Sequence, residues 1–234
     1  LGAGIVSLVA ILDLSSLRIL RARIYSRIKV VPRLWRPFLG CLFLFLGGDV
    51  MHLETKRLII RDFNINDLDA YYRLKANHEL AYYAGYKPYP DLKSAKYRLQ
   101  NILMLHDYYA ITLKNTGELI GDLNFYTDPI RKATDSFQLG FTLDISFWHK
   151  GFMSEALRTF IPYLFNHYNI DILTCVTMIE NVSSKHVIEA LNFHYDGIIR
   201  HYKRLYNGDM VDCMIYTLTN DEFERNDKNE KFKS

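Results

Sequence analysis

Residues 139–156, LGFTLDISFWHKGFMSEA, carry the strongest structural signal in this sequence. An alternating strand leads into a short loop that contains Gly151, and the loop opens directly into a helix. Such a junction presents unpaired backbone N–H groups at the positive end of the helix dipole, where a phosphate or pyrophosphate can bind. Gly151 has no side chain to keep the anion away from the backbone. A glycine before a helix is more often a simple turn, so the loop alone does not establish such a site.

Regular elements are predicted on both sides of this stretch. The predicted strands are 57–63, 108–114, 118–126, 137–143, 172–177, 193–202 and 210–218. One predicted helix begins near Asn64 or Asn66, and three more cover 92–105, 151–168 and 182–191. Pro162 is expected to kink its helix or remove one hydrogen bond, and the charged tail after Asn220 is expected to fray. The order of elements indicates an α/β (α+β) domain with a mixed, mostly antiparallel sheet of about six or seven strands, flanked by helices.

Composition is that of an ordinary globular protein. The 234 residues are enough for one domain of comfortable size, and 49% hydrophobic with 24% charged residues argues against a disordered or fibrous chain. The formal charge of +3 is uneven, because residues 1–50 hold seven basic and two acidic residues, a net of +5, which leaves 22 basic and 24 acidic residues elsewhere. This mildly acidic remainder has no electrostatic footprint for nucleic acid. Three scattered cysteines without a CxxC pair indicate a reducing, cytoplasmic location.

Residues 1–50 differ in character from the rest of the chain. Two apolar runs, 1–12 and 38–48, are each too short to span a bilayer, and a basic stretch lies between them. One interpretation is an amphipathic anchor at a membrane surface. The interpretation that we favour is upstream DNA translated in frame, because the codons for Gly47–Val50 can spell a bacterial ribosome-binding sequence just before Met51. We therefore predict three parts: a non-native or leader segment 1–50, a domain 51–218 that keeps its fold and activity without it, and a charged tail 219–234.

Several segments, in the same order along the chain, resemble the RimJ/RimL-type acetyltransferases of the GNAT superfamily. Residues 147–156, FWHKGFMSEA, are similar to the acetyl-CoA loop of that family, whose common form is YWGKGYATEA. Further similar segments are LETKRLIIR at 53–61, ELIG at 118–121, NVSSKHVIEALNF at 181–193 and YNGDMVD at 206–212. Together they extend over about 53–218, and their common order makes the resemblance specific although each segment alone is modest.

The resemblance implies a fold and a set of site residues. In this family the sheet is split between two central strands, and acetyl-CoA binds in the resulting V. Phe141 and Leu143 would belong to the strand whose backbone pairs with the pantetheine arm, with the Leu143 N–H polarising the acetyl carbonyl. Asn181 would bind the pantetheine region, and Ser184 would protonate the departing thiolate. The backbone N–H groups expected to hold the pyrophosphate are those of His149, Lys150, Gly151, Phe152 and Met153.

Other interpretations of these residues remain open. Ser184 fits a helix-turn hydroxyl that bonds its own backbone equally well, and Asn181 fits a plain N-cap. The general base is not identified, because Gln138 stands where relatives often have Glu, Lys203-Arg204 occupy a region where some have another Glu, and Ile188 replaces a tyrosine that serves as general acid in many GNAT proteins. The base is then a water held by the backbone and Gln138, or a carboxylate such as Asp122.

Three further departures lie in loops and at helix ends. His149 and Asn192 stand where the family usually has Gly, and Ile145 where it has Pro. The cluster Tyr82, Tyr83, Tyr86 and Tyr89 is either part of the acceptor mouth, which relatives build from this region, or a set of surface tyrosines that pack a loop.

The function expected from the resemblance is transfer of the acetyl group of acetyl-CoA to a primary amine by direct attack. The acceptor is a protein N-terminus or a small-molecule amine. The alternatives are a non-catalytic acyl-CoA-binding module and a membrane-associated regulator that uses residues 1–50. No HxxxH or HExxH spacing occurs, so no metal is expected. We expect no nucleic-acid partner, no membrane association unless residues 1–50 are native, and a monomer or homodimer.

Overall fold

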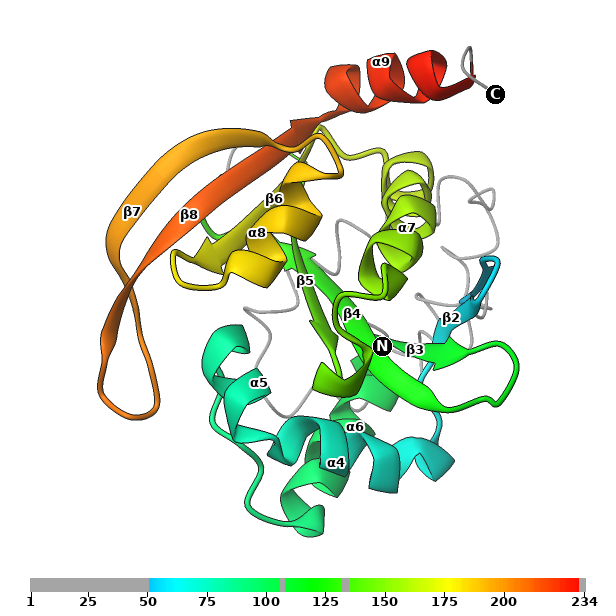
Figure 1. Ribbon diagram of the computed structural model, residues 1–234, viewed down its shortest axis with the longest axis vertical. Helices are drawn as coiled ribbons and strands as arrows, with labels where there is room; N and C mark the ends of the chain where they lie inside the picture. The colour runs from blue at the N-terminus through cyan, green and yellow to red at the C-terminus, as the bar shows by residue number, and fades with distance from the viewer. Residues whose placement is uncertain (1–50, 106–107, 132–134, 232–234) are drawn as a thin grey trace, which may run out of the picture. The chain divides into compact units, whose positions relative to one another are not determined.

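The computed structural model describes residues 51–105, 108–131 and 135–231 (Figure 1). The predictions for residues 1–50 lie outside this range. Nearly all of the described residues fall in one compact unit, Asp49–Phe165 with Asn169–Ser234. In the described part of the chain, no helix is both long and apolar enough to cross a membrane.

One eight-stranded sheet organises the domain, in the order β1-β2-β3-β4-β5-β6-β8-β7. The strands are β1 (His52–Glu54), β2 (Leu58–Asp62), β3 (Tyr108–Leu113), β4 (Leu119–Thr127), β5 (Ser136–Leu143), β6 (Ile172–Met178), β7 (His194–Arg204) and β8 (Met210–Thr219). Every neighbouring pair is antiparallel except β5 and β6, which run parallel. The predicted mixed, mostly antiparallel sheet is confirmed, with the short β1 as one strand more than expected.

The predicted split lies between β5 and β6. The two strands pair from Ser136↔Ile172 to Leu139↔Cys175 and then separate, although β5 continues to Leu143 and β6 to Met178. On its other side β5 pairs with β4 from Phe137 to Leu143. The backbone of residues 140–143 therefore has a strand partner only on the β4 side, and its other side faces an open V.

Helices cover both faces of the sheet. On one face, Phe160 of α7 (Phe152–Tyr168) packs against Tyr109 of β3 and Phe125 of β4, with ring centroids 5.6 and 6.3 Å away. On the other face, η2 (Ile65–Asp67), α4 (Leu68–Ala76), α5 (His78–Ala84) and α6 (Leu92–Leu105) form a second layer, with Tyr71 and Leu99 fully buried in its core. Successive strand residues point to opposite faces, so Tyr109 faces α7 while Ala110 faces α4 and α6.

The sequence patterns did not predict two of the helices, α5 and α9 (Asn220–Lys231). Residues 78–90, aromatic and rich in turn formers, have no predicted helix but contain α5. Asn77 caps this helix by accepting from the Leu80 N–H, and the helix ends at Gly85 in the left-handed region (φ 67°). The tail predicted to fray forms α9, whose first turn is held by reciprocal bonds between Thr219 and Glu222. That prediction was wrong, because the pattern missed this cap and the stacking of Phe223 on Phe165 at 4.7 Å. Helix α7 continues through Pro162.

Candidate active site

A sharp loop joins β5 to α7. It passes through η3 (Ile145–Phe147) and turns at His149 (φ 57°) and Gly151 (φ 74°), both in the left-handed region. Gly151 is the N-cap of α7 and offers no side-chain cap, so the first N–H groups of the helix have no cap from that residue. A Cβ at Gly151 would come no closer than 3.6 Å to another group, so its conformation, not lack of space, favours glycine here.

The opening strand motif fixes this loop from outside. Glu155, in the first turn of α7, accepts from the Thr55 hydroxyl (2.6 Å), the Arg57 backbone N–H (2.8 Å) and Arg57 Nε (2.6 Å). Arg57 also donates to the Lys150 carbonyl oxygen (3.0 Å) and lies 4.1 Å from the Phe152 ring centroid. Burial alone would raise the pKa of Glu155, but these hydrogen bonds hold it below its ordinary value. Two sequence motifs 100 positions apart thus form one structural clamp.

The end of β5 is also held closely. A Cβ on Gly121 of β4 would overlap the Thr142 carbonyl oxygen, which explains why a glycine stands at this point of β4. The indole N–H of Trp148 donates to the Leu143 carbonyl oxygen at 2.8 Å. Both contacts fix the backbone of residues 142–143, where the resemblance places acetyl polarisation.

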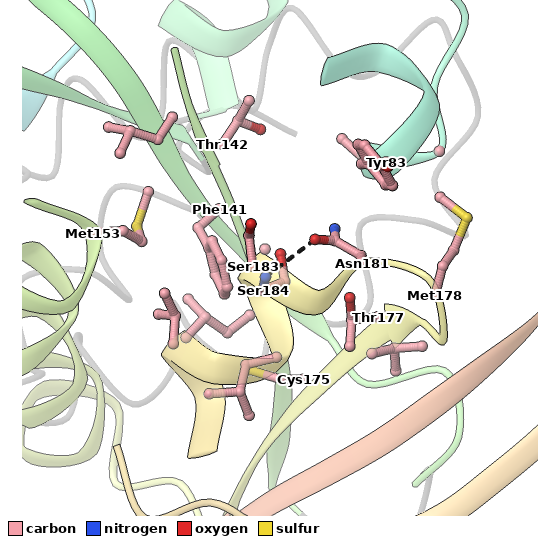
Figure 2. Close-up of a pocket in the computed structure, with 18 of the residues that line it drawn as sticks. Tyr83, Phe141, Thr142, Met153, Cys175, Thr177, Met178, Asn181, Ser183 and Ser184 are labelled. Atoms are coloured by element: carbon pink, nitrogen blue, oxygen red, sulfur yellow. Dashed lines mark hydrogen bonds between the residues drawn. The ribbon is translucent and has the colours of Figure 1, made fainter. Parts of the chain in front are cut away.

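A cavity of about 980 Å³ extends from this loop through the open V to α5 and β7 (Figure 2). Most of the sequence-predicted site residues line it: Gln138, Phe141, Leu143, His149, Gly151, Phe152, Met153, Asn181 and Ser184. Lys150 is exposed and does not line the cavity, because its ammonium donates to the Ser146 carbonyl oxygen at 2.7 Å. Of the four clustered tyrosines, Tyr83 and Tyr86 line the cavity, whereas Tyr82 and Tyr89 do not.

Asn181 and Ser184 meet at the start of α8 (Val182–Glu189). The Asn181 side-chain oxygen accepts from the Ser184 backbone N–H at 3.1 Å, the bond drawn as a dashed line in Figure 2. The N-cap role predicted for Asn181 is therefore confirmed. The cap uses the side-chain oxygen of Asn181, Oδ1, so the hydrogens of its side-chain NH2 group remain available to a ligand. Because the cap bonds the backbone of Ser184, it does not depend on the serine hydroxyl.

Unpaired polar atoms gather at this cavity. In the described part of the chain, the buried side-chain atoms without a hydrogen bond are Tyr86 Oη, both Asp122 carboxylate oxygens, Gln138 Oε1 and Thr177 Oγ1. All four residues that carry these five atoms line the cavity. Buried polar atoms are normally satisfied, so such a concentration indicates a ligand site. Burial raises the pKa of the Tyr202 phenol, while a hydrogen bond with Gln138 opposes that rise.

Sequence reasoning missed the pairing of Lys75 with Asp122. The Lys75 ammonium of α4 lies 2.6 Å from an Asp122 oxygen of β4, and the two side chains are 6% and 1% exposed. Although Asp122 Oδ2 is that close, its geometry does not make a hydrogen bond, so the contact is an ion pair. The available signal was a lysine on the apolar side of an amphipathic helix, which sequence alone does not match with a partner.

Two thiols also line the cavity. Burial raises the pKa of Cys175 well above its ordinary value and that of Cys213 to about 11. Both therefore remain protonated at neutral pH and are poor nucleophiles. In the described residues, no group of three or more His, Cys, Asp or Glu side chains is arranged to hold a metal ion.

Known proteins share both the sequence pattern and the fold. The family model "Acetyltransferase (GNAT) domain" matches residues 57–194, more than half of the chain. The uncharacterized N-acetyltransferase p20 of Bacillus licheniformis is 28% identical over 176 residues, covering 73% of this chain and 97% of p20. A GNAT-family acetyltransferase structure from Bacillus anthracis is 19% identical with a TM-score of 0.66, covering 74% of this chain and all of that one. The ribosomal L7/L12 α-N-protein acetyltransferase RimL in complex with coenzyme A is 21% identical with a TM-score of 0.62, covering 74% and 99%.

The split sheet, the loop before α7 and these relatives together define an acyltransferase. More narrowly, the chain belongs to the GNAT acetyltransferase family, and its relatives are N-acetyltransferases. RimL is among the solved structures with the same fold, in agreement with the RimJ/RimL-type resemblance of the sequence.

Proposed function

We propose that this protein transfers the acetyl group of acetyl-CoA to a primary amine. The observation that carries the proposal is the continuity of one cavity, which begins at the N-terminus of α7, follows the unpaired side of β5 and ends among unsatisfied polar side chains. A helix N-terminus suits a pyrophosphate, and a strand edge suits the amides of a pantetheine arm. The coenzyme A complex of the related RimL supports the same donor here.

The residues of the cofactor side fit this donor. The backbone N–H groups of residues 149–153 would hold the pyrophosphate, with His149 and Met153 beside it. Phe141 and Leu143 would pair with the pantetheine arm through their backbone. The amide hydrogens of Asn181, free of its capping bond, would reach the same arm.

The chemistry is direct attack of the neutral amine on the thioester carbonyl. The C–N bond forms, the carbonyl oxygen becomes an oxyanion that the Leu143 N–H stabilises, and the C–S bond then breaks. Ser184 gives its proton to the departing thiolate and recovers one from solvent. The protonated thiols of Cys175 and Cys213 argue against an acyl-cysteine intermediate.

After attack the amine nitrogen loses one proton to water, and the amide product keeps the other. Gln138 is buried, with a relative exposure of 7%, and in the described part of the chain its Oε1 has no hydrogen-bond partner. An amide oxygen cannot accept a proton at neutral pH, but it can orient a water that does. Gln138 therefore acts through that water and not as a base itself.

The acceptor is a protein N-terminal amine or a small-molecule amine. Aromatic side chains surround the far end of the cavity, including Tyr83, Tyr86 and Tyr126, and Lys203 stands at its exposed rim. Burial lowers the pKa of Lys203. Arg204 does not line the cavity and donates instead to the Gly208 carbonyl oxygen.

A thiol-release assay tests the proposal. The full chain is incubated with acetyl-CoA and, in turn, tyramine, putrescine, and tetrapeptides that begin with Ala or Ser. Amine-dependent release of coenzyme A together with an acetylated product is the expected result. Binding of acetyl-CoA without release for any amine would instead leave an acyl-CoA-binding module, the alternative that the amide at Gln138 favours.

A further inference from the structure

The Lys75–Asp122 ion pair lies in a position that stability alone does not explain. Two charges taken out of water cost more than their attraction usually returns, so a buried ion pair is weak evidence of a stabilising role. This pair is almost fully buried, at 6% and 1% exposure, and it borders the cavity that holds the proposed reaction. Asp122 also keeps an oxygen that no hydrogen bond satisfies.

The pair connects the acceptor wall to the strand of the reacting centre. Asp122 is the register partner of Thr142 on β5, directly before Leu143, and Lys75 Nζ donates to the Thr142 hydroxyl at 3.4 Å. Lys75 belongs to α4, which leads through Asn77 into α5, the helix that carries Leu80 and Tyr83 of the cavity wall.

The surroundings hold the lysine in one place. Its ammonium lies 5.0 Å from the Tyr86 ring centroid and 5.9 Å from that of Tyr71, within the range of cation–π attraction. Its backbone carbonyl oxygen accepts from the Tyr89 N–H at 3.2 Å, so the loop after α5 folds back onto the same residue. One residue thus contacts α4, the loop after α5, β4 and β5.

We propose that Lys75 and Asp122 are positioning residues for the acceptor amine: the pair fixes α4 and α5 over the acetyl-binding end of β5. This inference rests on the proposed function. Sealed from solvent and held by Lys75, Asp122 is placed to position its neighbours and not to take the proton of the amine. The acceptor side therefore depends on the pair, whereas the pyrophosphate loop, held by Thr55, Arg57 and Glu155, does not.

Variants that remove one or both charges separate positioning from stability. Lys75→Met alone leaves a buried, unpaired carboxylate, and we expect Tm to fall by about 10 °C. Lys75→Met with Asp122→Leu replaces the pair by apolar side chains, and we expect Tm to return to within a few degrees of wild type. In this double variant the acceptor kcat/KM for tyramine or the Ala tetrapeptide should still be at least tenfold lower, with the Kd for acetyl-CoA changed less than twofold.

A matched control uses the other charged pair near α4. Arg61 and Asp67 form two bonds of 2.8 Å and do not line the cavity. Arg61→Met should lower Tm without a selective fall in acceptor kcat/KM. A double variant with wild-type acceptor kcat/KM would overturn the inference and leave the proposed function intact.

A second variant tests the inference if the double variant folds poorly. Thr142→Val removes the hydroxyl that holds Lys75 to β5 and leaves both charges paired, and we expect acceptor kcat/KM to fall at least threefold at constant acetyl-CoA affinity. Unchanged acceptor kcat/KM in Thr142→Val would also overturn the inference. If the wild type releases no coenzyme A with any amine of the panel, the proposed function fails first, and the pair has no acceptor to position.

Discussion

The two ends of the cavity are built in different ways. The proposed cofactor end is mostly one continuous stretch, residues 139–153, with Asn181 added from the start of α8, and backbone groups of the stretch would make most of its contacts. The acceptor end is assembled from side chains of α4, α5, β4 and β7, which the fold alone brings together. A backbone site leaves a local sequence pattern, because it needs a strand, a turn and a helix in order. A side-chain site assembled from distant elements leaves none.

The largest expected effect on turnover comes from Ser184, where the two ends of the cavity meet. Ser184→Ala should lower kcat by about 100-fold or more, since a placed general acid contributes typically 10²–10⁴-fold. Stability should hardly change, because the cap of α8 runs from Asn181 to the Ser184 backbone N–H, which alanine keeps. Turnover assays and urea unfolding measure both quantities.

Ser183 supplies the matched control for this prediction. It lines the same cavity one residue earlier on α8, and Figure 2 shows both serines beside Asn181. Ser183→Ala should change kcat less than threefold. Equal effects of the two substitutions would remove the proton-transfer role from Ser184 and leave solvent as the donor to the thiolate.

The cofactor end is tested by charge at Gly151. Gly151→Asp places a carboxylate beside the pyrophosphate, and we expect acetyl-CoA affinity to fall at least tenfold, about 1.4 kcal/mol. Asparagine has the same shape and also tolerates the left-handed conformation, so Gly151→Asn should lose no more than about threefold. Calorimetry at low and high salt separates the two, because salt screens only the charge effect. Equal affinities of the Asp and Asn variants would contradict the loop assignment.

These expectations show how far the sequence alone leads. Strand alternation predicted seven of the eight strands, and the motif predicted the loop at Gly151, because both signals are local. The split between two central strands, which lies between β5 and β6, was implied only by the family resemblance. The sequence patterns missed α5, where seven residues in an aromatic stretch are too few to show helical periodicity, and α9, whose cap and aromatic stacking involve Thr219 and Phe165. The Lys75–Asp122 pair was out of reach, because each charge alone resembles a solvated one and only the fold shows that they meet.

The clamp of Thr55, Arg57 and Glu155 should contribute a smaller amount to the free energy of unfolding, and this contribution should depend on pH. Glu155→Gln weakens the bonds from Thr55 and Arg57, and we expect a loss of about 0.5–1 kcal/mol because the pair is partly exposed. The folded-state pKa of Glu155 lies below its ordinary 4.5, so this stabilisation is complete above about pH 4.5 and is lost as pH falls through the folded value.

Urea unfolding of wild type and Glu155→Gln should therefore differ at pH 7 and converge in acid. Glu118→Gln, on the exposed hairpin between β3 and β4, is the control that should show no such difference at pH 7. A Glu155→Gln deficit that persists undiminished at low pH would mean that the carboxylate charge does not hold the clamp.

The smallest expected effect compares the two positions where a family glycine is replaced. His149 (φ 57°) and Asn192 (φ 61°) both adopt the left-handed conformation that explains the usual glycine, but only His149 lines the cavity. Changing either to Gly relieves backbone strain of about 1 kcal/mol and loses a similar amount to the greater freedom of the unfolded chain. The free energy of unfolding of both variants should therefore lie within about 0.5 kcal/mol of the wild-type value.

The affinity for acetyl-CoA should differ between the two variants. His149→Gly removes an imidazole beside the proposed pyrophosphate site and should weaken acetyl-CoA binding about threefold, as expected for one exposed hydrogen bond. Asn192→Gly should bind acetyl-CoA as wild type does. If both bind equally well, the histidine is a tolerated loop residue and the cofactor end depends on backbone alone.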